Sequence, residues 1–193
     1  MPIFNRAKNI LLSPKTEWAV INGETETPQS LLFKYVIPMS LIPAAALFIG
    51  FGIIGYGGFL VRGLMMALNS FISSIISYYI CTYVVDAMAP NFGSEKNVGK
   101  SAQLVAYSFT ASWVGGIFFL IPSLSLLAML AGLYGIYLFY EGIPVMKKTS
   151  EQNRLGYLLV SALVIIVVYI VLEMVLRRLL YPVFGYPIGL DLY

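Results

Sequence analysis

Two acidic residues beside apolar segments, Asp86 and Glu141, are the positions where this sequence could carry out proton chemistry. Two carboxyl groups that lie close together can share a proton, because both cannot ionise at short range. Nothing else in the sequence supports a reaction. The chain contains no histidine, and a serine nucleophile needs a neighbouring base. We therefore expect no catalytic residue and no enzymatic activity.

Metal and thiol chemistry is equally restricted. The absence of histidine removes the commonest neutral metal ligand. The single cysteine, Cys81, cannot form an intrachain disulfide or half of a thiolate zinc site. It lies in an apolar run, where a free cysteine behaves as a small packing residue. We expect neither a metal ion nor a cofactor.

Five polar residues near the ends of apolar segments predict a cluster at one membrane surface: Asp86, Lys100, Gln103, Tyr140 and Glu141. A charge near the hydrocarbon region is costly and often functional. The alternative is that each of these side chains reaches water independently at the interface. Both interpretations stay open at this point.

Two further sets recur at helical spacing within apolar segments: Ser70, Ser73, Ser74, Ser77 and Cys81, and Tyr134, Tyr137 and Tyr140. The first set predicts either a packing seam or the polar lining of a permeation path. A seam is the simpler explanation, because small residues let helix backbones approach and a seryl hydroxyl can bond to its own backbone. The tyrosines predict a hydrogen-bonding strip toward the bundle interior or the cytoplasmic mouth. Other small residues predict further seams: Gly115, Gly116, Ala128, Gly132 and Gly135.

Membrane-spanning helices must position these residues. Hydrophobic residues make up 59% of the 193 residues and charged residues only 11%, against about 25% charged in soluble domains. A span needs about 20 predominantly apolar residues. Five segments qualify: residues 33–55, 64–87, 101–121, 124–143 and 156–177. The predicted fold is an all-α transmembrane bundle of five helices, with a kink in the first at Pro38 and Pro43.

An amphipathic helix is predicted before the first span, over residues 2–12. Its apolar face consists of Ile3, Phe4, Ala7, Ile10 and Leu11. On its polar face, Arg6 and Lys8 are expected to contact anionic lipid, and Trp18 is expected to anchor the next segment at the interface. The alternative is a disordered tail with accidental periodicity. The expected organisation is an interfacial segment, a five-helix domain and a short tail, over residues 1–30, 31–180 and 181–193.

Basic residues predict the orientation of the bundle. Five spans place the two termini on opposite sides of the membrane, and Lys and Arg concentrate in cytoplasmic loops. With a cytoplasmic N-terminus, nine of the twelve Lys and Arg residues are cytoplasmic, and only Arg62, Arg177 and Arg178 lie on the other side. We therefore predict a cytoplasmic N-terminus and an external C-terminus. The first 30 residues lack the pattern of a cleavable signal peptide, so the first span is expected to direct insertion.

Two stretches resemble the Yip domain family, the small membrane proteins named for their interaction with Ypt/Rab GTPases. They are RAKNILLSPKTEWAVINGE near the N-terminus and LAGLYGIYLFYEGIPVMKKTSEQNRLGY in and after the fourth predicted span. The resemblance implies a five-helix bundle with a cytosolic N-terminus and, for eukaryotic members, vesicle trafficking through small GTPases. This sequence lacks the long cytosolic extension of those members. It resembles a compact prokaryotic member of the cytoplasmic (inner) membrane, for which small-GTPase binding is not expected.

The sequence thus predicts a non-enzymatic protein that organises the membrane or binds a partner within it. The alternative is a transporter or channel for a small solute, an ion or a lipid, which the prolines and glycines of the first span and the two polar strips favour. Five spans cannot form two equal halves, so an inverted-repeat transporter would need a dimer. The expected partners are the bilayer and either a second copy of the chain or another membrane protein. No nucleic-acid partner is expected, because the net charge of +3 lies in short loops.

Overall fold

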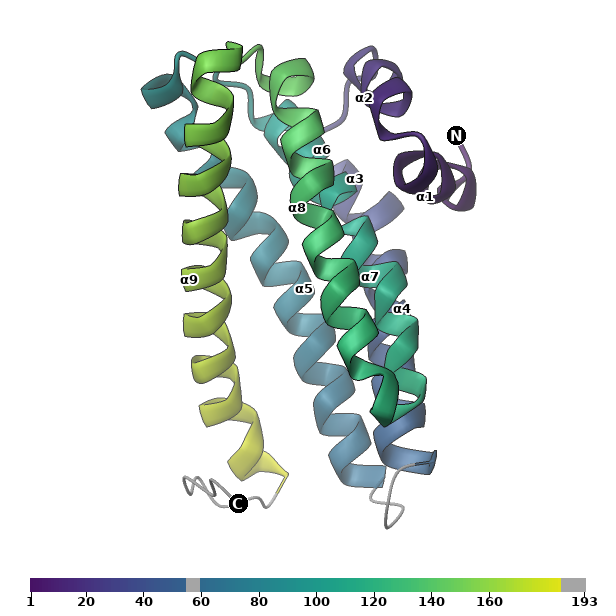
Figure 1. Cartoon of the computed structure of the whole chain (residues 1–193). Coiled ribbons are helices and arrows are strands. Elements are labelled where there is room, and N and C mark those ends of the chain that lie inside the picture. The colour runs from purple at the N-terminus through teal and green to yellow at the C-terminus, as the bar shows by residue number, and fades with distance from the viewer. Residues whose placement is uncertain (55–59, 185–193) are drawn as a thin grey trace.

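The computed structural model describes residues 1–54 and 60–184, and over these residues the regular structure is entirely helical (Figure 1). Five helical stretches are long and apolar enough to cross a membrane: Pro28–Ile54, Leu60–Phe92, Val98–Leu120, Pro122–Lys147 and Glu151–Val183. The predicted all-α bundle of five spans is therefore confirmed. Each span begins two to five residues earlier than predicted, because the helices continue beyond their apolar segments into more polar sequence.

The first span changes its helical geometry along its length. It contains α3 (Pro28–Leu31), the π-helical turn η1 (Leu32–Val36), α4 (Ile37–Leu47) and the π-helical turn η2 (Phe48–Ile54). Pro38 lies at the start of α4 and Pro43 inside it. A proline has no N–H to donate, so the regular hydrogen-bond ladder is interrupted at each. The helix has π geometry on both sides of α4. A kink at the prolines stays a prediction.

The other spans consist of one long helix or of a few shorter helices. The second is α5 (Leu60–Met88) with η3 (Ala89–Phe92), and the third is α6 (Val98–Ser108), α7 (Thr110–Gly115) and η4 (Gly116–Leu120). The fourth is η5 (Pro122–Leu124) with α8 (Ser125–Lys147), and the fifth is α9 (Glu151–Val183). Gly115 of the third span packs directly against the fourth span, since a Cβ atom added at Gly115 would lie 2.2 Å from Ala131 Cβ.

Two short helices, α1 (Ile3–Leu12) and α2 (Pro14–Asn22), lie against the bundle beside α7 and α8 (Figure 1). Trp18 of α2 is fully buried, and its indole Nε1 donates a hydrogen bond to the Leu138 carbonyl of α8 at 3.1 Å. The prediction that Trp18 anchors the chain at the lipid interface is therefore wrong. The protein itself satisfies both the ring and its N–H, because Gly142 leaves a recess on α8: an added Cβ there would lie 2.7 Å from Trp18 Cε2.

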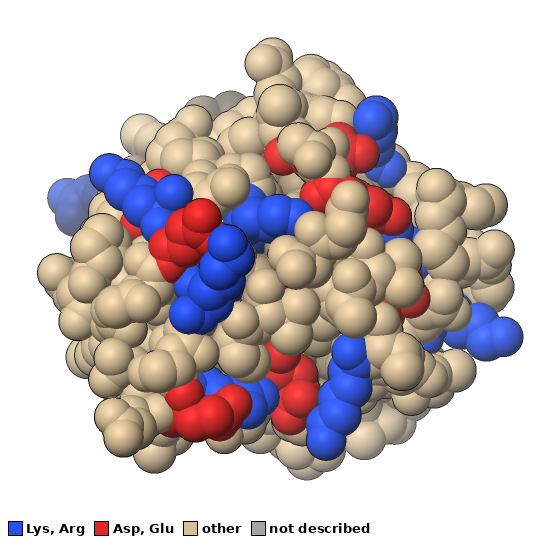
Figure 2. Space-filling model, turned by 90° about the horizontal axis from the view of Figure 1, so that it is seen from above, with Lys and Arg blue, Asp and Glu red and all other residues tan. Residues whose placement is uncertain are grey.

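The bundle has two unlike ends. The α1/α2 end also carries the α5–α6 and α8–α9 connections, and the C-terminal end of α9 lies at the opposite end (Figure 1). Viewed from the α1/α2 end, Lys, Arg, Asp and Glu side chains gather on the surface (Figure 2). Beneath them lies a packed layer of fully buried side chains: Val85, Leu104, Leu138, Ile143 and Tyr157. The division into residues 1–30, 31–180 and 181–193 stays a prediction, and residues 185–193 lie outside the described structure.

Candidate functional site

Asp86 is the centre of a buried polar cluster at the α1/α2 end. Its Oδ1 accepts hydrogen bonds from Lys147 Nζ at 3.0 Å, from Ser101 Oγ at 3.0 Å and from the Asn97 backbone N–H at 2.8 Å. The side chains of Asp86 and Lys147 are 3% and 0% exposed. The pair connects the ends of α5 and α8 with the start of α6. A buried pair of this kind is strongly destabilised when one partner is lost, because an uncompensated charge remains.

Lys100 and Gln103 do not join Asp86. The Lys100 ammonium donates to the backbone carbonyls of Asn22 and Glu24 at 2.6 and 3.0 Å. The Gln103 amide donates to the carbonyls of Ile21 and Glu24 at 3.4 and 3.2 Å. These two side chains hold the linker that follows α2 against α6.

Tyr140 and Glu141 form a third group with Arg154 of α9. The Arg154 guanidinium lies 3.7 Å from the centre of the Tyr140 ring, and its Nη2 lies 3.5 Å from Glu141 Oε1. The predicted single cluster of five residues is therefore wrong. Glu141 and Lys147 are six residues apart on α8, so they point to different sides of the helix. Sequence reasoning missed Lys147 because it follows Pro144 and lies outside the predicted span 124–143, whereas α8 continues to it.

Arg6 also differs from its prediction as a lipid contact. It is buried, and its guanidinium forms ion pairs with Glu17 and Glu24. Burial by itself would lower the pKa of Arg6, but Tyr107 and the two glutamates together raise that pKa above its ordinary value. The charge is therefore compensated inside the protein. Lys8 is exposed, and its contact with anionic lipid stays a prediction.

The predicted tyrosine strip and the serine strip lie on different surfaces. Tyr134 and Tyr137 are partly exposed, and the Tyr134 hydroxyl donates to the Leu11 carbonyl of α1 at 2.7 Å. Neither tyrosine contributes to the cavity described below, into which α8 instead presents Gly132 and Ile136. The predicted tyrosine strip therefore does not point into the bundle interior. Tyr134 contacts the N-terminal helix, and Tyr140 lies under Arg154 near the α1/α2 end.

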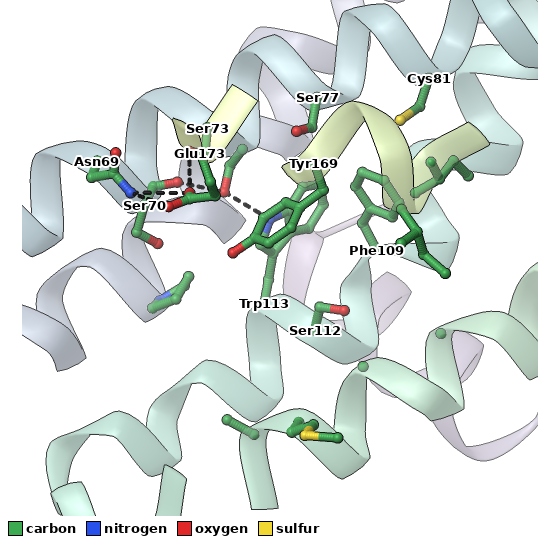
Figure 3. A pocket seen from close by; sticks show the side chains of 18 of the residues that line it. Asn69, Ser70, Ser73, Ser77, Cys81, Phe109, Ser112, Trp113, Tyr169 and Glu173 are labelled. Carbon is green, nitrogen blue, oxygen red and sulfur yellow. Dashed lines mark hydrogen bonds between the residues drawn. The ribbon is translucent and has the colours of Figure 1, made fainter. Parts of the chain in front are cut away.

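The serine strip lines a cavity of about 840 Å³. The cavity lies chiefly between α5, α8 and α9, and α4, α6, α7 and η4 complete its wall (Figure 3). The α5 residues Ser70, Ser73, Ser74 and Ser77 and Cys81 all contribute to it. The volume falls within the range of about 300–1,000 Å³ that is usual for small-molecule sites. The serine face of α5 is thus a cavity wall, not the packing seam that was the simpler explanation.

The cavity opens sideways between two spans and is closed toward the α1/α2 end. Exposed lining residues lie on both α8 and α9: Met129 is 64%, Ile166 is 52% and Tyr169 is 54% exposed. These residues mark the mouth. The lining on α5 ends at Cys81, and Val85, one turn further, is fully buried. No opening toward that end occurs among the residues that the structure describes.

The carboxylate of Glu173 lines the cavity, toward the C-terminal end of α9. Glu173 accepts hydrogen bonds from Asn69 Nδ2 at 3.0 Å on each oxygen and from Ser73 Oγ at 2.9 Å (Figure 3). Arg177 Nε lies 3.5 Å from the same carboxylate, as a spacing of four residues on one helix allows. Asn69 was missed, because a single amide in an apolar helix has no distinguishing sequence signal.

Some polar atoms of the cavity lack a partner. Ser77 Oγ, Ser108 Oγ and Asn69 Oδ1 have no hydrogen-bond partner within the described part of the chain. Trp113 Nε1 donates to Ser74 Oγ at 3.4 Å, so α7 meets α5 one turn from Ser77. Among the same described residues, no group of three or more acidic or cysteine side chains could hold a metal ion. The cavity therefore offers hydroxyl and amide groups, with one compensated ion pair.

Comparison with known proteins identifies the family. Residues 8–172 match the model of the Yip1 domain. The chain belongs to the Yip1 domain family. This confirms the resemblance found in the two sequence stretches. The family match includes α2 to α8 and most of the cavity, and it ends one residue before Glu173.

Similar proteins share a membrane location in their names. The inner membrane protein YohC of Escherichia coli strain K12 is 27% identical to this Yip1 domain protein over 155 residues, which cover 75% of this chain and 80% of that relative. The protein of the same name from Escherichia coli O6:H1 strain CFT073 shows the same values. No solved structure shows a significant match.

Proposed function

We propose that this Yip1 domain protein is a non-enzymatic membrane protein that binds a lipid of the surrounding bilayer in the cavity between α5, α8 and α9. The observation that carries the proposal is the position of the mouth, which opens between two spans and not at the α1/α2 end. A molecule that enters from the side of a span comes from the bilayer. The mixture of apolar side chains with a few polar groups suits an amphipathic molecule.

The surroundings of the mouth favour lipid as the occupant. In the most apolar part of α9, only 11% of the residues are buried inside the molecule, so this helix presents most of its surface to the bilayer. The exposed rim residues Met129 and Ile166 are apolar, and lipid chains contact them without any other protein. A second copy of the chain seated at the mouth is the competing occupant, and it would exclude lipid from the cavity.

The proposed location is a prokaryotic inner membrane with the α1/α2 end at the cytoplasm. Support comes from the name of the relatives and from the nine basic residues on the predicted cytoplasmic side. In a Cys81→Ser background, a membrane-impermeant maleimide should label Lys96→Cys only in inverted vesicles. It should label Arg178→Cys only in intact spheroplasts. The reverse pattern would invert the proposed orientation.

Tryptophan fluorescence can detect a lipid in the cavity. The chain has two tryptophans, and Trp113 lines the cavity while being only 4% exposed. In a Trp18→Phe variant reconstituted with chain-brominated phosphatidylcholine, we expect Trp113 to be quenched, since bromine acts at short range. The matched control is Trp113→Phe, in which the fully buried Trp18 should remain unquenched. An unquenched Trp113 in correctly folded protein would refute lipid binding in the cavity.

A variant with a larger side chain in the cavity tests whether the lipid that quenches Trp113 reaches it through the cavity. A Cβ atom added at Gly132 would lie 3.6 Å from Ser112 Oγ, which is ordinary contact, so Gly132→Leu should narrow the cavity beside Ser112 without breaking the fold. We expect it to reduce the quenching of Trp113. The control is Leu133→Phe, the next residue on α8 and one that faces outward. Equal quenching in both variants would show that lipid reaches Trp113 by another route.

Lipid transport is the second candidate function, because the cavity is long. Its α5 lining runs from Met65 to Cys81, about 24 Å along the helix axis, against a hydrocarbon core of about 30 Å. The packed layer at the α1/α2 end opposes a continuous path. Proteoliposomes should be tested for flux of ions, small solutes and labelled lipid. Labelled lipid that crosses faster than in empty liposomes would support transport, and unchanged rates for all three would leave lipid binding as the function.

A further inference from the structure

The polar cavity residues that α5 contributes occupy one short section of that helix. Asn69 and Ser77 mark its limits, and the separation of eight positions corresponds to about 12 Å of helix. Ser108 and Ser112 face the section from the third span. Much of the remaining lining is apolar, as at Leu47, Phe139 and Ile165. The cavity therefore has a polar section of limited length next to apolar surface, which is the arrangement of a lipid head and its chains.

Two deeply buried hydroxyls in the cavity have no partner. Ser77 is 7% and Ser108 is 2% exposed, and neither Oγ has a hydrogen-bond partner among the described residues. Figure 3 shows Ser77 on the α5 wall, one turn beyond Ser73. A buried polar group without a partner is costly, and no water is available in the bilayer core to satisfy it. A ligand hydroxyl can pair with either serine, because it can donate and accept.

Asn69 adds an acceptor to these hydroxyls. Its Nδ2 is used by Glu173, while its Oδ1 lacks a partner in the described structure. An amide oxygen can only accept, so the ligand must supply a donor at this position. Hydroxyl groups meet the requirements of all three atoms, whereas a phosphate oxygen supplies no donor.

The charges of the cavity favour an uncharged head. Glu173 and Arg177 are the charged residues among the described lining residues, and they lie 3.5 Å apart at their nearest atoms. A phosphate placed beside Glu173 would meet a like charge, and an ammonium group would meet one at Arg177. Because the pair is already compensated, a neutral head enters without disturbing it.

We propose that the cavity takes a lipid whose head is uncharged and carries hydroxyl groups, the chemistry shared by diacylglycerol and glycosylated diacylglycerols. The head contacts Ser77, Ser108 and Asn69, and the chains leave between α8 and α9. This inference rests on the proposed lipid binding and adds the chemical class of the ligand.

A competition experiment tests the class of head. The Trp18→Phe protein is reconstituted in chain-brominated phosphatidylcholine, and unbrominated dioleoylglycerol, monoglucosyl dioleoylglycerol, phosphatidylethanolamine or phosphatidylglycerol is added stepwise. We expect a hydroxyl-headed neutral lipid to restore Trp113 fluorescence at a mole fraction on the order of fivefold lower than the two phospholipids, as two added hydrogen bonds would give. The better of the two neutral lipids identifies the source of the hydroxyls.

Two serine variants test whether the preference for a hydroxyl-headed neutral lipid depends on the hydroxyls of Ser77 and Ser108. The double variant Ser77→Ala and Ser108→Ala removes only unpartnered hydroxyls, so it should fold and should lose that preference of about fivefold. The matched control is Ser125→Ala, whose hydroxyl lines the same cavity but already donates to the Pro122 carbonyl at 2.6 Å. This control should keep the preference.

The outcomes separate the inference from the function on which it rests. Equal competition by all four lipids, or an unchanged preference in the double variant, would overturn the neutral hydroxyl head while Trp113 quenching still supports lipid binding. Stronger competition by phosphatidylethanolamine would also overturn it, in favour of a zwitterionic head at Glu173 and Arg177. If no brominated lipid quenches Trp113, the proposed function itself fails.

Discussion

Buried polar side chains occur both at the α1/α2 end and in the cavity, and the two regions differ in how these groups are partnered. At the α1/α2 end, Asp86 has three donors and Arg6 has two acidic partners. In the cavity, the hydroxyls of Ser77 and Ser108 are unpartnered within the described structure. Packing follows the same division, since the spans enclose a fully buried layer near one end and diverge around a cavity toward the other.

This difference indicates that the two regions of the bundle have different roles. The packed end holds α1, α2 and the second to fifth spans together through paired charges and close contacts, so substitutions there should affect stability. The cavity residues satisfy few of one another's hydrogen bonds, so substitutions there should affect the proposed lipid binding more than the fold. Four pairs of variants or conditions test this comparison.

The largest effect is expected for the buried ion pair. Lys147→Met leaves Asp86 buried without a countercharge, and should lower the free energy of unfolding by about 3–5 kcal/mol. The matched control is Lys148→Met, because Lys148 is exposed and pairs with Glu95 at the surface, where an ion pair contributes little to stability. Thermal unfolding in mild detergent measures both. Equal losses would contradict the assignment of stability to the buried pair.

Two glycines on α8 compare the regions on one helix. A Cβ atom added at Gly142 would lie 2.5 Å from Leu104 Cδ1 and 2.7 Å from Trp18 Cε2, so Gly142→Ala should cost about 1–3 kcal/mol through overpacking. Gly132→Ala faces the cavity and should gain up to about 1 kcal/mol from better helix propensity. The same unfolding assay measures the loss of stability expected for Gly142→Ala and the gain expected for Gly132→Ala. A loss of stability in Gly132→Ala would show that the cavity wall is packed more tightly than its geometry indicates.

Two serines give the corresponding comparison for hydrogen bonds. Ser101 Oγ lies 3.0 Å from Asp86 Oδ1 and 2.7 Å from Lys147 Nζ, so Ser101→Ala should cost about 1.5–3 kcal/mol, as for bonds to charged groups. Ser77→Ala removes a hydroxyl with no partner in the described structure and should change stability by less than about 0.5 kcal/mol. A large loss for Ser77→Ala in lipid-free detergent would indicate a structural role for that hydroxyl.

The smallest effect is expected from pH. A hydrogen bond from Ser30 holds the pKa of Glu26 below its ordinary value, with a further contribution from Lys34. A lowered pKa in the folded state stabilises the protein above the unfolded-state pKa, and this contribution is lost as pH falls through the folded-state pKa. The wild type should therefore lose slightly more stability than Glu26→Gln between neutral pH and acid below the ordinary carboxyl pKa. Identical acid profiles would remove Glu26 from the stabilising groups of the packed end.

Several features were accessible from the sequence because they depend on local composition. The five spans follow from apolar runs, and the pair of Glu173 and Arg177 follows from a spacing of one helical turn. The grouping of Asp86, Lys100, Gln103, Tyr140 and Glu141 failed for a geometric reason. All lie near one end of the bundle, but the rotation of each helix decides which neighbour a side chain meets, and a sequence pattern does not contain that rotation.

The sequence by itself determined the membrane architecture, because a bilayer demands long apolar segments with internally satisfied backbones, and such segments are visible in the order of residues. The two quoted stretches determined the family, which the match over residues 8–172 confirmed. Only the tertiary structure decided that Trp18 is buried, that Lys147 is the partner of Asp86 and that the serines of α5 line a cavity. These are properties of surfaces from three or more helices, set by their packing and not by any one segment.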